Sequence, residues 1–290
     1  MKVIDKIRSE KISFSFEVFP PKTEDKFEAI QVATEQVAAL SPDFMSVTYG
    51  AGGGTSKFTV KIASDIQKKF NIPVLAHLSC ISSTKEGVRH QLEAIREAGI
   101  ENVLALRGDI PQGAVNAGDW DYHYASELVR EIKEFDPGIC IGGACYPECH
   151  PESKSQREDI LNMKKKVDAG CEFLTTQMFF DNNVYWNYLY KVRDAGINVP
   201  IVAGIMPITS VKQVERSLKL SGAQVPLKFK YMVDRFGHDA EAMRQAGIIY
   251  ATEQIVDLIA NGVSAVHLYT MNNAYVAESI KNNLKGILEI

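Results

Sequence analysis

The sequence predicts an α/β protein, a TIM (β/α)8 barrel formed by residues 1–290 as a single domain. Eight short apolar segments recur along the chain, and helical stretches separate most of them. Polar residues cluster at the C-terminal ends of these segments, which is where a barrel of this type carries its chemistry. Alternating strands and helices with right-handed crossovers form a parallel sheet, and eight such units close it.

Breaking and capping residues bound the first two units. Pro20-Pro21 ends the first strand, residues 13–19, and a threonine can cap the helix that we expect over 23–40. The second strand, residues 44–49, runs into a glycine-rich loop over 50–55.

The next two units follow the same order. The third strand, residues 74–78, precedes a helix over 84–98, which Gly99 terminates. The fourth strand, residues 103–106, is followed by a long loop with proline and glycine, and its helix begins near Tyr122.

The fifth and sixth strands flank one helix. Within the fifth strand, residues 139–144, Gly142-Gly143 allows another group to approach the backbone closely. A helix over 153–169 then leads to the sixth strand, residues 173–177.

The last part of the chain is richer in helix. A Met-Pro pair ends the seventh strand, residues 201–205. Two helical stretches, 211–220 and 226–260, precede the eighth strand, residues 265–269, and the final helix covers 275–288.

Successive side chains of a strand point to opposite faces, so the faces can be assigned from the sequence. In the first strand Glu17 lies opposite its apolar neighbours, and in the fourth unit Arg107 and Asp109 lie opposite Leu104 and Leu106. If the apolar faces pack under helices, the polar faces converge on the barrel interior.

Composition excludes several classes of protein. The chain is 46% hydrophobic and 23% charged with a net charge of −4, and this charge balance does not indicate a nucleic-acid-binding protein. No apolar run is long enough for a membrane span, and the charged N-terminus is no signal peptide, so we expect a cytoplasmic protein.

The chain has an odd number of cysteines, 5, which is consistent with reduced thiols. Cys145, Cys149 and His150 lack the second ligand pair of a zinc site, so we expect no metal.

Four residues are candidates for chemistry. Glu17 is a strand-end carboxyl between apolar residues, where burial favours the protonated form that can donate a proton; the alternative is an exposed strand end. Asp109, beside a glycine, could be a turn residue or lie against a planar ligand. The amide of Gln177 could read a heterocycle with donors and acceptors, whereas His77 alone is typical of a core histidine.

The glycines at 50–54 do not form a common nucleotide-binding motif. The dinucleotide fingerprint would need glycine at position 55, which is threonine, and the chain has no phosphate-loop motif. Any dinucleotide must therefore be held by barrel loops. The serine-hydrolase motif G-x-S-x-G is also absent.

Seven segments together resemble the bacterial methylenetetrahydrofolate reductases. In the order of that family, they are Ser15–Lys22, Val47–Gly53, Ala76–Leu78, Leu106–Asp109, Tyr146–Glu152, Thr176–Asp181 and Gly204–Pro207. Each segment alone is weak, but seven in sequence are specific, and the match covers the chain from about residue 10 to residue 275.

The resemblance implies a barrel that binds FAD and reduces 5,10-methylenetetrahydrofolate to 5-methyltetrahydrofolate with electrons from NADH or NADPH, in one-carbon metabolism and methionine supply. It implies that Glu17 is the general acid that helps to open the folate's five-membered ring, that Asp109 lies by the flavin's pyrimidine side and contacts the pterin, and that Gln177 binds the pterin. It further implies that the flavin is held by Thr48, His77, Arg107, Gly108, Asp109, Tyr124, Tyr146, His150, Asp159, Asn162 and Lys166.

The chain departs from the family at two positions. The family often has an aromatic residue covering the substrates where we place Val211, and a basic residue where this chain has Asn273. We expect a homo-oligomer without the C-terminal regulatory domain of the eukaryotic relatives.

Two other functions stay open. An aldolase-type barrel would need a Schiff-base lysine in the interior, and none of the expected strands contains one. A flavin- or folate-binding subunit could take its electrons from a partner protein instead of a free nucleotide.

Overall fold

Eight parallel strands close into one barrel in chain order, which confirms the predicted fold. The structure, a computed structural model, describes residues 1–21, 23–49, 56–110 and 120–289, so the predicted glycine loop lies outside the described residues. The strands are β1 Ser13–Val18, β2 Met45–Val47, β3 Val74–Ser79, β4 Asn102–Leu106, β5 Cys140–Cys145, β6 Phe173–Thr176, β7 Ile201–Ile205 and β8 Ala265–Tyr269. β1 pairs with β8 from Ser13 opposite Ala265 to Glu17 opposite Tyr269, and this pairing closes the sheet.

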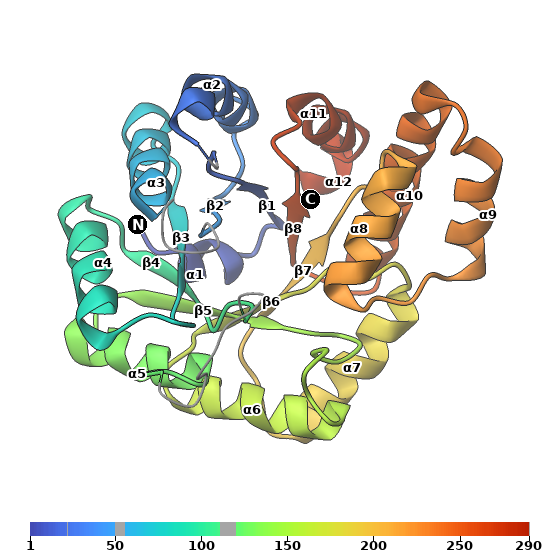
Figure 1. The fold of residues 1–290 in the computed structure, drawn as a ribbon. Coiled ribbons are helices and arrows are strands. Elements are labelled where there is room, and N and C mark those ends of the chain that lie inside the picture. The colour runs from blue at the N-terminus through green and yellow to red at the C-terminus, as the bar shows by residue number, and fades with distance from the viewer. Residues whose placement is uncertain (22, 50–55, 111–119, 290) are drawn as a thin grey trace.

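Helices form a ring around the strands (Figure 1). The ring consists of α2 Phe27–Ala38, α3 Ser56–Phe70, α4 Lys85–Glu97, α5 Ala125–Phe135, α6 Gln156–Asp168, α7 Asn182–Asp194, α10 Ala240–Ala260 and α11 Ala274–Asn283. Two further helices, α8 Val211–Ser221 and α9 Leu227–Phe236, lie between β7 and α10 in the chain. The short elements are α1 Val3–Ile7, η1 Glu24–Lys26 and α12 Lys285–Leu288.

The helical stretch expected over 226–260 is two helices. α9 ends at Gly237, and Asp239 then caps α10 by accepting a hydrogen bond from the Ala242 N–H at 2.8 Å. A capping aspartate starts a new helix because its carboxylate satisfies a free N–H of the first turn. The structure also contains α3 and α7, for which the sequence analysis assigned no helix.

The N-terminal end of the barrel is closed by α1. Its residues Val3, Ile4 and Ile7 are buried in one cluster with inward-facing strand residues such as Leu75 and Phe173. The side chain of Asn102 on β4 fixes this helix, since its Oδ1 accepts a hydrogen bond from the Val3 N–H at 2.8 Å. With this end filled by apolar side chains, the polar interior is confined to the other end.

The predicted faces hold for β1 but not for β4. In β4, Leu104 and Leu106 line the interior, and the residues between and beside them pack under the helices. Arg107 and Asp109 follow the strand, where the backbone turns at Gly108 with a φ of +91°. Side chains alternate between the two faces only within a strand, so this alternation cannot be continued through the turn. Arg107 and Asp109 therefore reach the cavity from the loop, although Leu104 and Leu106 also face the interior.

Candidate active site

A cavity of about 1160 Å³ lies at the carboxyl ends of the strands. Its wall brings together ten of the residues singled out from the sequence, although they come from distant parts of the chain. These are Glu17, Thr48, His77, Arg107, Gly108, Asp109, Tyr146, His150, Lys166 and Gln177. Residues of α8 form another part of the wall.

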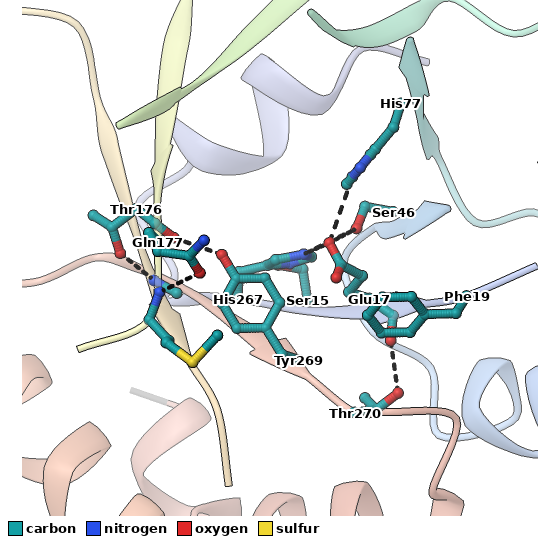
Figure 2. A network of polar contacts seen from close by, with 12 residues as sticks. Ser15, Glu17, Phe19, Ser46, His77, Thr176, Gln177, His267, Tyr269 and Thr270 are labelled. Atoms are coloured by element: carbon teal, nitrogen blue, oxygen red, sulfur yellow. Dashed lines mark hydrogen bonds and ion pairs between the residues drawn. The ribbon is translucent and has the colours of Figure 1, made fainter. Parts of the chain in front are cut away.

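Glu17, on β1, is 6% exposed, and its carboxyl points toward the side chains of Ser46 on β2 and His77 on β3 (Figure 2). Its Oε2 accepts a hydrogen bond from the Ser46 hydroxyl at 3.3 Å and lies 3.5 Å from Nε2 of His77. The Thr270 hydroxyl donates to the backbone carbonyl of Glu17 at 2.6 Å and so fixes the strand end. The carboxyl is therefore buried and held among polar groups, not exposed at a strand end.

His267 on β8, which was not among the residues predicted from the sequence, belongs to the same network. Its Nε2 lies 3.0 Å from the Ser46 hydroxyl, and its Nδ1 lies 2.7 Å from the Ser15 hydroxyl. Its ring stacks on Phe44 with the ring centroids 5.7 Å apart. The pairing of β8 with β1 could have identified it, because this pairing places a polar residue, His267, directly opposite Ser15 on the inward face.

The Ser46 hydroxyl links Glu17 to His267. It donates to Oε2 of Glu17 at 3.3 Å and also lies 3.0 Å from Nε2 of His267. The Ser15 hydroxyl donates to the carbonyl of Val266 at 3.1 Å, so it can accept from Nδ1–H of His267. Hydroxyl groups of two strands therefore hold the carboxyl and the imidazole in fixed positions.

His77 contributes an unused polar atom. Burial lowers the pKa of His77 to about 4, so the ring is neutral near neutral pH. Its Nε2 is buried and has no hydrogen-bond partner within the described chain. It points toward Oε2 of Glu17, 3.5 Å away, which is too far for a good hydrogen bond (Figure 2).

Gln177 and Tyr269 form the opposite wall (Figure 2). The Gln177 Oε1 accepts a hydrogen bond from the backbone N–H of Met178 at 2.9 Å, which orients the amide. The Tyr269 hydroxyl donates to the carbonyl of Thr176 at 2.5 Å, and its ring meets the ring of His267 edge to face, with centroids 5.5 Å apart. This wall offers an oriented amide beside an aromatic surface.

A second group of polar residues lies at the ends of β4 and β5. Arg107 holds Glu152 with two hydrogen bonds, at 2.8 and 2.6 Å. Burial raises the pKa of Tyr146 to about 12, and its ring meets that of His150 with centroids 4.7 Å apart. The Lys166 ammonium donates to the carbonyl of Ala144 at the end of β5. Together they form an aromatic and cationic region.

Gly108 has no side chain, so its backbone borders this region directly. Its φ of +91° is unfavourable for other residues, and a Cβ atom there would lie 2.1 Å from the Ser79 Oγ. Asp109 follows it as an exposed side chain on the cavity wall. The turn therefore presents backbone and a carboxylate side by side.

Three residues of the expected flavin site do not line the cavity. Tyr124 is 53% exposed and precedes α5. Asp159 accepts a hydrogen bond from the backbone N–H of His150 at 3.1 Å and so acts behind the wall. The side-chain oxygen of Asn162, on α6, accepts a hydrogen bond from the Lys165 ammonium at 3.2 Å.

The two departures from the family pattern have local structural explanations. Val211 is the first residue of α8 and lies against Gly237, not on the cavity wall. The α8 residues that line the cavity are Lys212, Gln213, Arg216 and Ser217. Asn273 caps α11 by accepting from the Val276 N–H at 3.2 Å, so its side chain is engaged in the fold.

Three kinds of feature are absent from the described part of the chain. No group of three His, Cys, Asp or Glu side chains there is placed to hold a metal ion. None of the helices described is both long and apolar enough to cross a membrane. The lysines on the cavity wall, Lys166 and Lys212, come from helices and not from strands.

Comparison with known proteins gives consistent matches. The family model described as methylenetetrahydrofolate reductase matches residues 2–285. The 5,10-methylenetetrahydrofolate reductase of Escherichia coli (strain K12) is 35% identical over 276 residues, which cover 94% of this chain and 90% of that protein. Methylenetetrahydrofolate reductase (NADH) 1 of Arabidopsis thaliana is 37% identical over 308 residues, and the chain spans 51% of its length.

One solved structure extends the comparison to the fold. An uncharacterized protein from Clostridium thermocellum, described as binding two copies of 5-methyl-5,6,7,8-tetrahydrofolic acid, superposes with a TM-score of 0.68. The alignment covers 99% of both chains at 17% identity. A match at that identity supports the barrel fold.

Proposed function

Because this chain belongs to the methylenetetrahydrofolate reductase family, we propose that it reduces 5,10-methylenetetrahydrofolate to 5-methyltetrahydrofolate. Electrons would come from NADH or NADPH and pass through FAD in a ping-pong sequence. The observation that carries the proposal is Glu17, a buried carboxyl that is held by Ser46 on the wall of a large cavity.

The cavity has the properties that a bound flavin requires. Gly108 lets a flat ring approach the backbone, and the side chain of His77 lines the same cavity. Arg107 and Lys166 supply positive charge for a diphosphate, and Tyr146 supplies an aromatic surface. FAD bound there would supply hydride transfer between the nucleotide and the folate.

Glu17 would act on the folate. Opening the methylene bridge requires a proton on the bridging nitrogen, and this generates the electrophilic iminium that is reduced. Ser46 and His267 would hold the carboxyl in position for this proton transfer. The oriented amide of Gln177 would bind the pterin, whose edge carries both donors and acceptors.

The proposal is tested by the spectrum of the purified protein under anaerobic conditions. We expect a yellow protein whose visible absorbance is bleached by NADH or NADPH alone and restored by methylenetetrahydrofolate, with 5-methyltetrahydrofolate as product. A colourless protein that takes up no flavin on reconstitution would overturn the proposal. Bleaching that occurs only with an added electron-transfer protein would instead favour an electron-accepting subunit.

A further inference from the structure

The end of β1, which carries Glu17, runs beyond its backbone pairing with β8. That pairing stops at Glu17 opposite Tyr269. Two residues later the chain enters Pro20-Pro21, and a proline has no N–H to donate to a neighbouring strand. The segment from Glu17 to Phe19 therefore needs partners other than a paired strand on the side of β8.

Asn272 supplies such a partner for Phe19. The Oδ1 of Asn272 accepts a hydrogen bond from the Phe19 N–H at 2.8 Å, and its Nδ2 donates to the Phe19 carbonyl at 2.9 Å. A side-chain amide carries a donor and an acceptor, as a peptide group does, so it can satisfy both backbone groups of one residue. The amide of Asn272 thus replaces a neighbouring strand at this point.

Thr270 connects Asn272 to Glu17. Its buried hydroxyl donates to the Glu17 carbonyl at 2.6 Å (Figure 2) and accepts from the backbone N–H of Asn272 at 3.2 Å. We call Thr270 and Asn272 the β1 clamp, because together they bond the backbone of β1 at Glu17 and at Phe19.

The β1 clamp includes an unfavourable backbone conformation. Met271 and Asn272 have φ angles of 52° and 57°, in the left-handed region that residues other than glycine rarely adopt. Such conformations persist where the surrounding contacts fix them, and they cluster at functional sites. Met271 and Phe19 line the cavity together with Glu17, so the strained turn borders the candidate active site.

We propose that Asn272 and Thr270 are positioning residues for the proton donor Glu17. This inference rests on the proposed function. The carboxyl must lie within hydrogen-bond reach of the folate nitrogen that it protonates, and a displacement of about 1 Å can cost roughly 100-fold in rate. The clamp bonds only the backbone of β1, so it acts on the carboxyl by fixing the strand end from which the side chain extends.

The first test is Asn272→Ala, measured by stopped-flow absorbance in both half-reactions. We expect reoxidation by methylenetetrahydrofolate to slow about 10–100-fold, and bleaching by NADH or NADPH to stay within about threefold of the parent. Normal bleaching also shows that the variant folds and holds its flavin. Bleaching that slows as much as reoxidation would mean that the whole site is disturbed, and the proposal would be wrong.

Asn71→Ala is the matched control. Asn71 also has a left-handed φ, of 56°, but it is exposed and lies off the cavity wall. The control therefore removes an asparagine from the same kind of backbone without touching β1. We expect both half-reactions to proceed as in the parent. Equal slowing of reoxidation by the two alanine variants would exclude a specific role for Asn272.

Thr270 allows a test of the hydroxyl alone. Thr270→Val keeps the shape of the side chain without the hydroxyl, and Thr270→Ser keeps the hydroxyl. We expect valine to slow reoxidation about tenfold and serine to restore it to within about threefold of the parent. If both variants slow reoxidation equally, the effect comes from packing, and the hydroxyl has no positioning role.

Combining Asn272→Ala with Glu17→Gln separates positioning from a general loosening of the folate site. A residue that acts through Glu17 has nothing to position once the side chain cannot transfer a proton. Adding Asn272→Ala to Glu17→Gln should therefore slow reoxidation by less than about threefold. Slowing by the full factor of the single variant would show that Asn272 acts independently of Glu17, against the proposal.

Failure of the proposed function gives a different result. If methylenetetrahydrofolate does not reoxidise the parent protein, the proposed activity is wrong, and carbon NMR of the Glu17 carboxyl decides the role of the clamp. Glu17→Gln identifies this resonance by its loss. We expect Asn272→Ala to move the resonance and Asn71→Ala to leave it in place. A resonance unchanged in both variants would show that the clamp does not set the position of the carboxyl.

Discussion

Glu17 is buried and yet faces the cavity, and a general acid needs a fixed position within reach of its substrate. The carboxyl is 6% exposed and lies on the cavity wall. Its partners Ser46 and His267 come from β2 and β8, the two neighbours of β1 in the barrel. Closure of the sheet therefore brings Ser46 and His267 to the two sides of Glu17.

The variant Glu17→Gln should separate the two half-reactions. Glutamine keeps the shape and the hydrogen bonding of the side chain but cannot transfer a proton. Hydride transfer from NADH to flavin needs no protonation of folate, so bleaching should stay within about tenfold of the parent, while reoxidation by methylenetetrahydrofolate should slow by roughly 10²–10⁴. Stopped-flow absorbance measures both rates. Reoxidation at the parent rate would mean that Glu17 is structural.

Asp109→Asn tests charge at the flavin side of the cavity. If the Asp109 carboxylate lies near the flavin's pyrimidine edge, it disfavours the anionic reduced flavin and keeps the cofactor a strong reductant. Asparagine removes the charge at nearly constant size, so we expect a higher flavin reduction potential and slower folate reduction. Potentiometric titration with a reference dye measures the first. An unchanged potential would exclude this electrostatic role.

At the scale of elements, the turn after β4 determines which backbone atoms line the cavity without a covering side chain. An alanine at position 108 would have to adopt a φ of +91° and place its Cβ 2.1 Å from the Ser79 Oγ. Gly196 supplies a control, since its φ is +75° but a Cβ there meets nothing within 4 Å. We expect Gly196→Ala to cost about 1–2 kcal/mol of the free energy of unfolding through backbone strain alone.

Gly108→Ala should cost more than its control by about 1–3 kcal/mol, because the added methyl overpacks the turn. It should also weaken flavin binding, whereas Gly196→Ala should not. Urea unfolding of the flavin-free proteins and flavin titration measure the two effects. Equal destabilisation by the two variants would show that the turn accommodates the methyl group.

The strands were predictable because apolar segments and breaking residues mark them directly, as Pro20-Pro21 does after β1. The inward face of β4 could not be predicted, because leucines such as Leu104 and Leu106 can pack either inside the barrel or under a helix. His267 was missed because a histidine in an apolar strand has no local signal, and its role depends on Ser15 across the closing pair of strands. Long-range contacts of this kind are absent from a sequence pattern.

At the scale of the whole molecule, the barrel is divided along its axis. Apolar side chains with α1 fill the N-terminal end, and buried polar groups occupy the other end. The polar end costs stability, since each buried group gives up water for partners that the fold must supply. His77 shows this cost most clearly, because its Nε2 has no hydrogen-bond partner within the described residues.

The cost at His77 should appear as a pH dependence of global stability. Burial lowers its pKa from 6.5 to about 4, while the nearby Glu17 opposes the shift and His267 adds to it. Between these pH values the unfolded chain binds more protons than the folded one, so the free energy of unfolding falls as the pH drops from about 6.5 to about 4. The full loss from this residue is on the order of 3 kcal/mol.

His77→Asn removes the titrating ring and should remove this part of the pH dependence. Because asparagine is smaller, the variant can be less stable at every pH, so the informative quantity is the difference in unfolding free energy between pH 7 and about pH 4.5. We expect the flavin-free parent to lose about 2–3 kcal/mol more than the flavin-free variant over this interval. Urea unfolding followed by circular dichroism measures both, and carboxylates elsewhere contribute equally to the two proteins. Equal losses would mean that His77 gains a proton in the folded state as easily as in the unfolded chain, and the neutral ring assigned to the cavity wall would then be wrong.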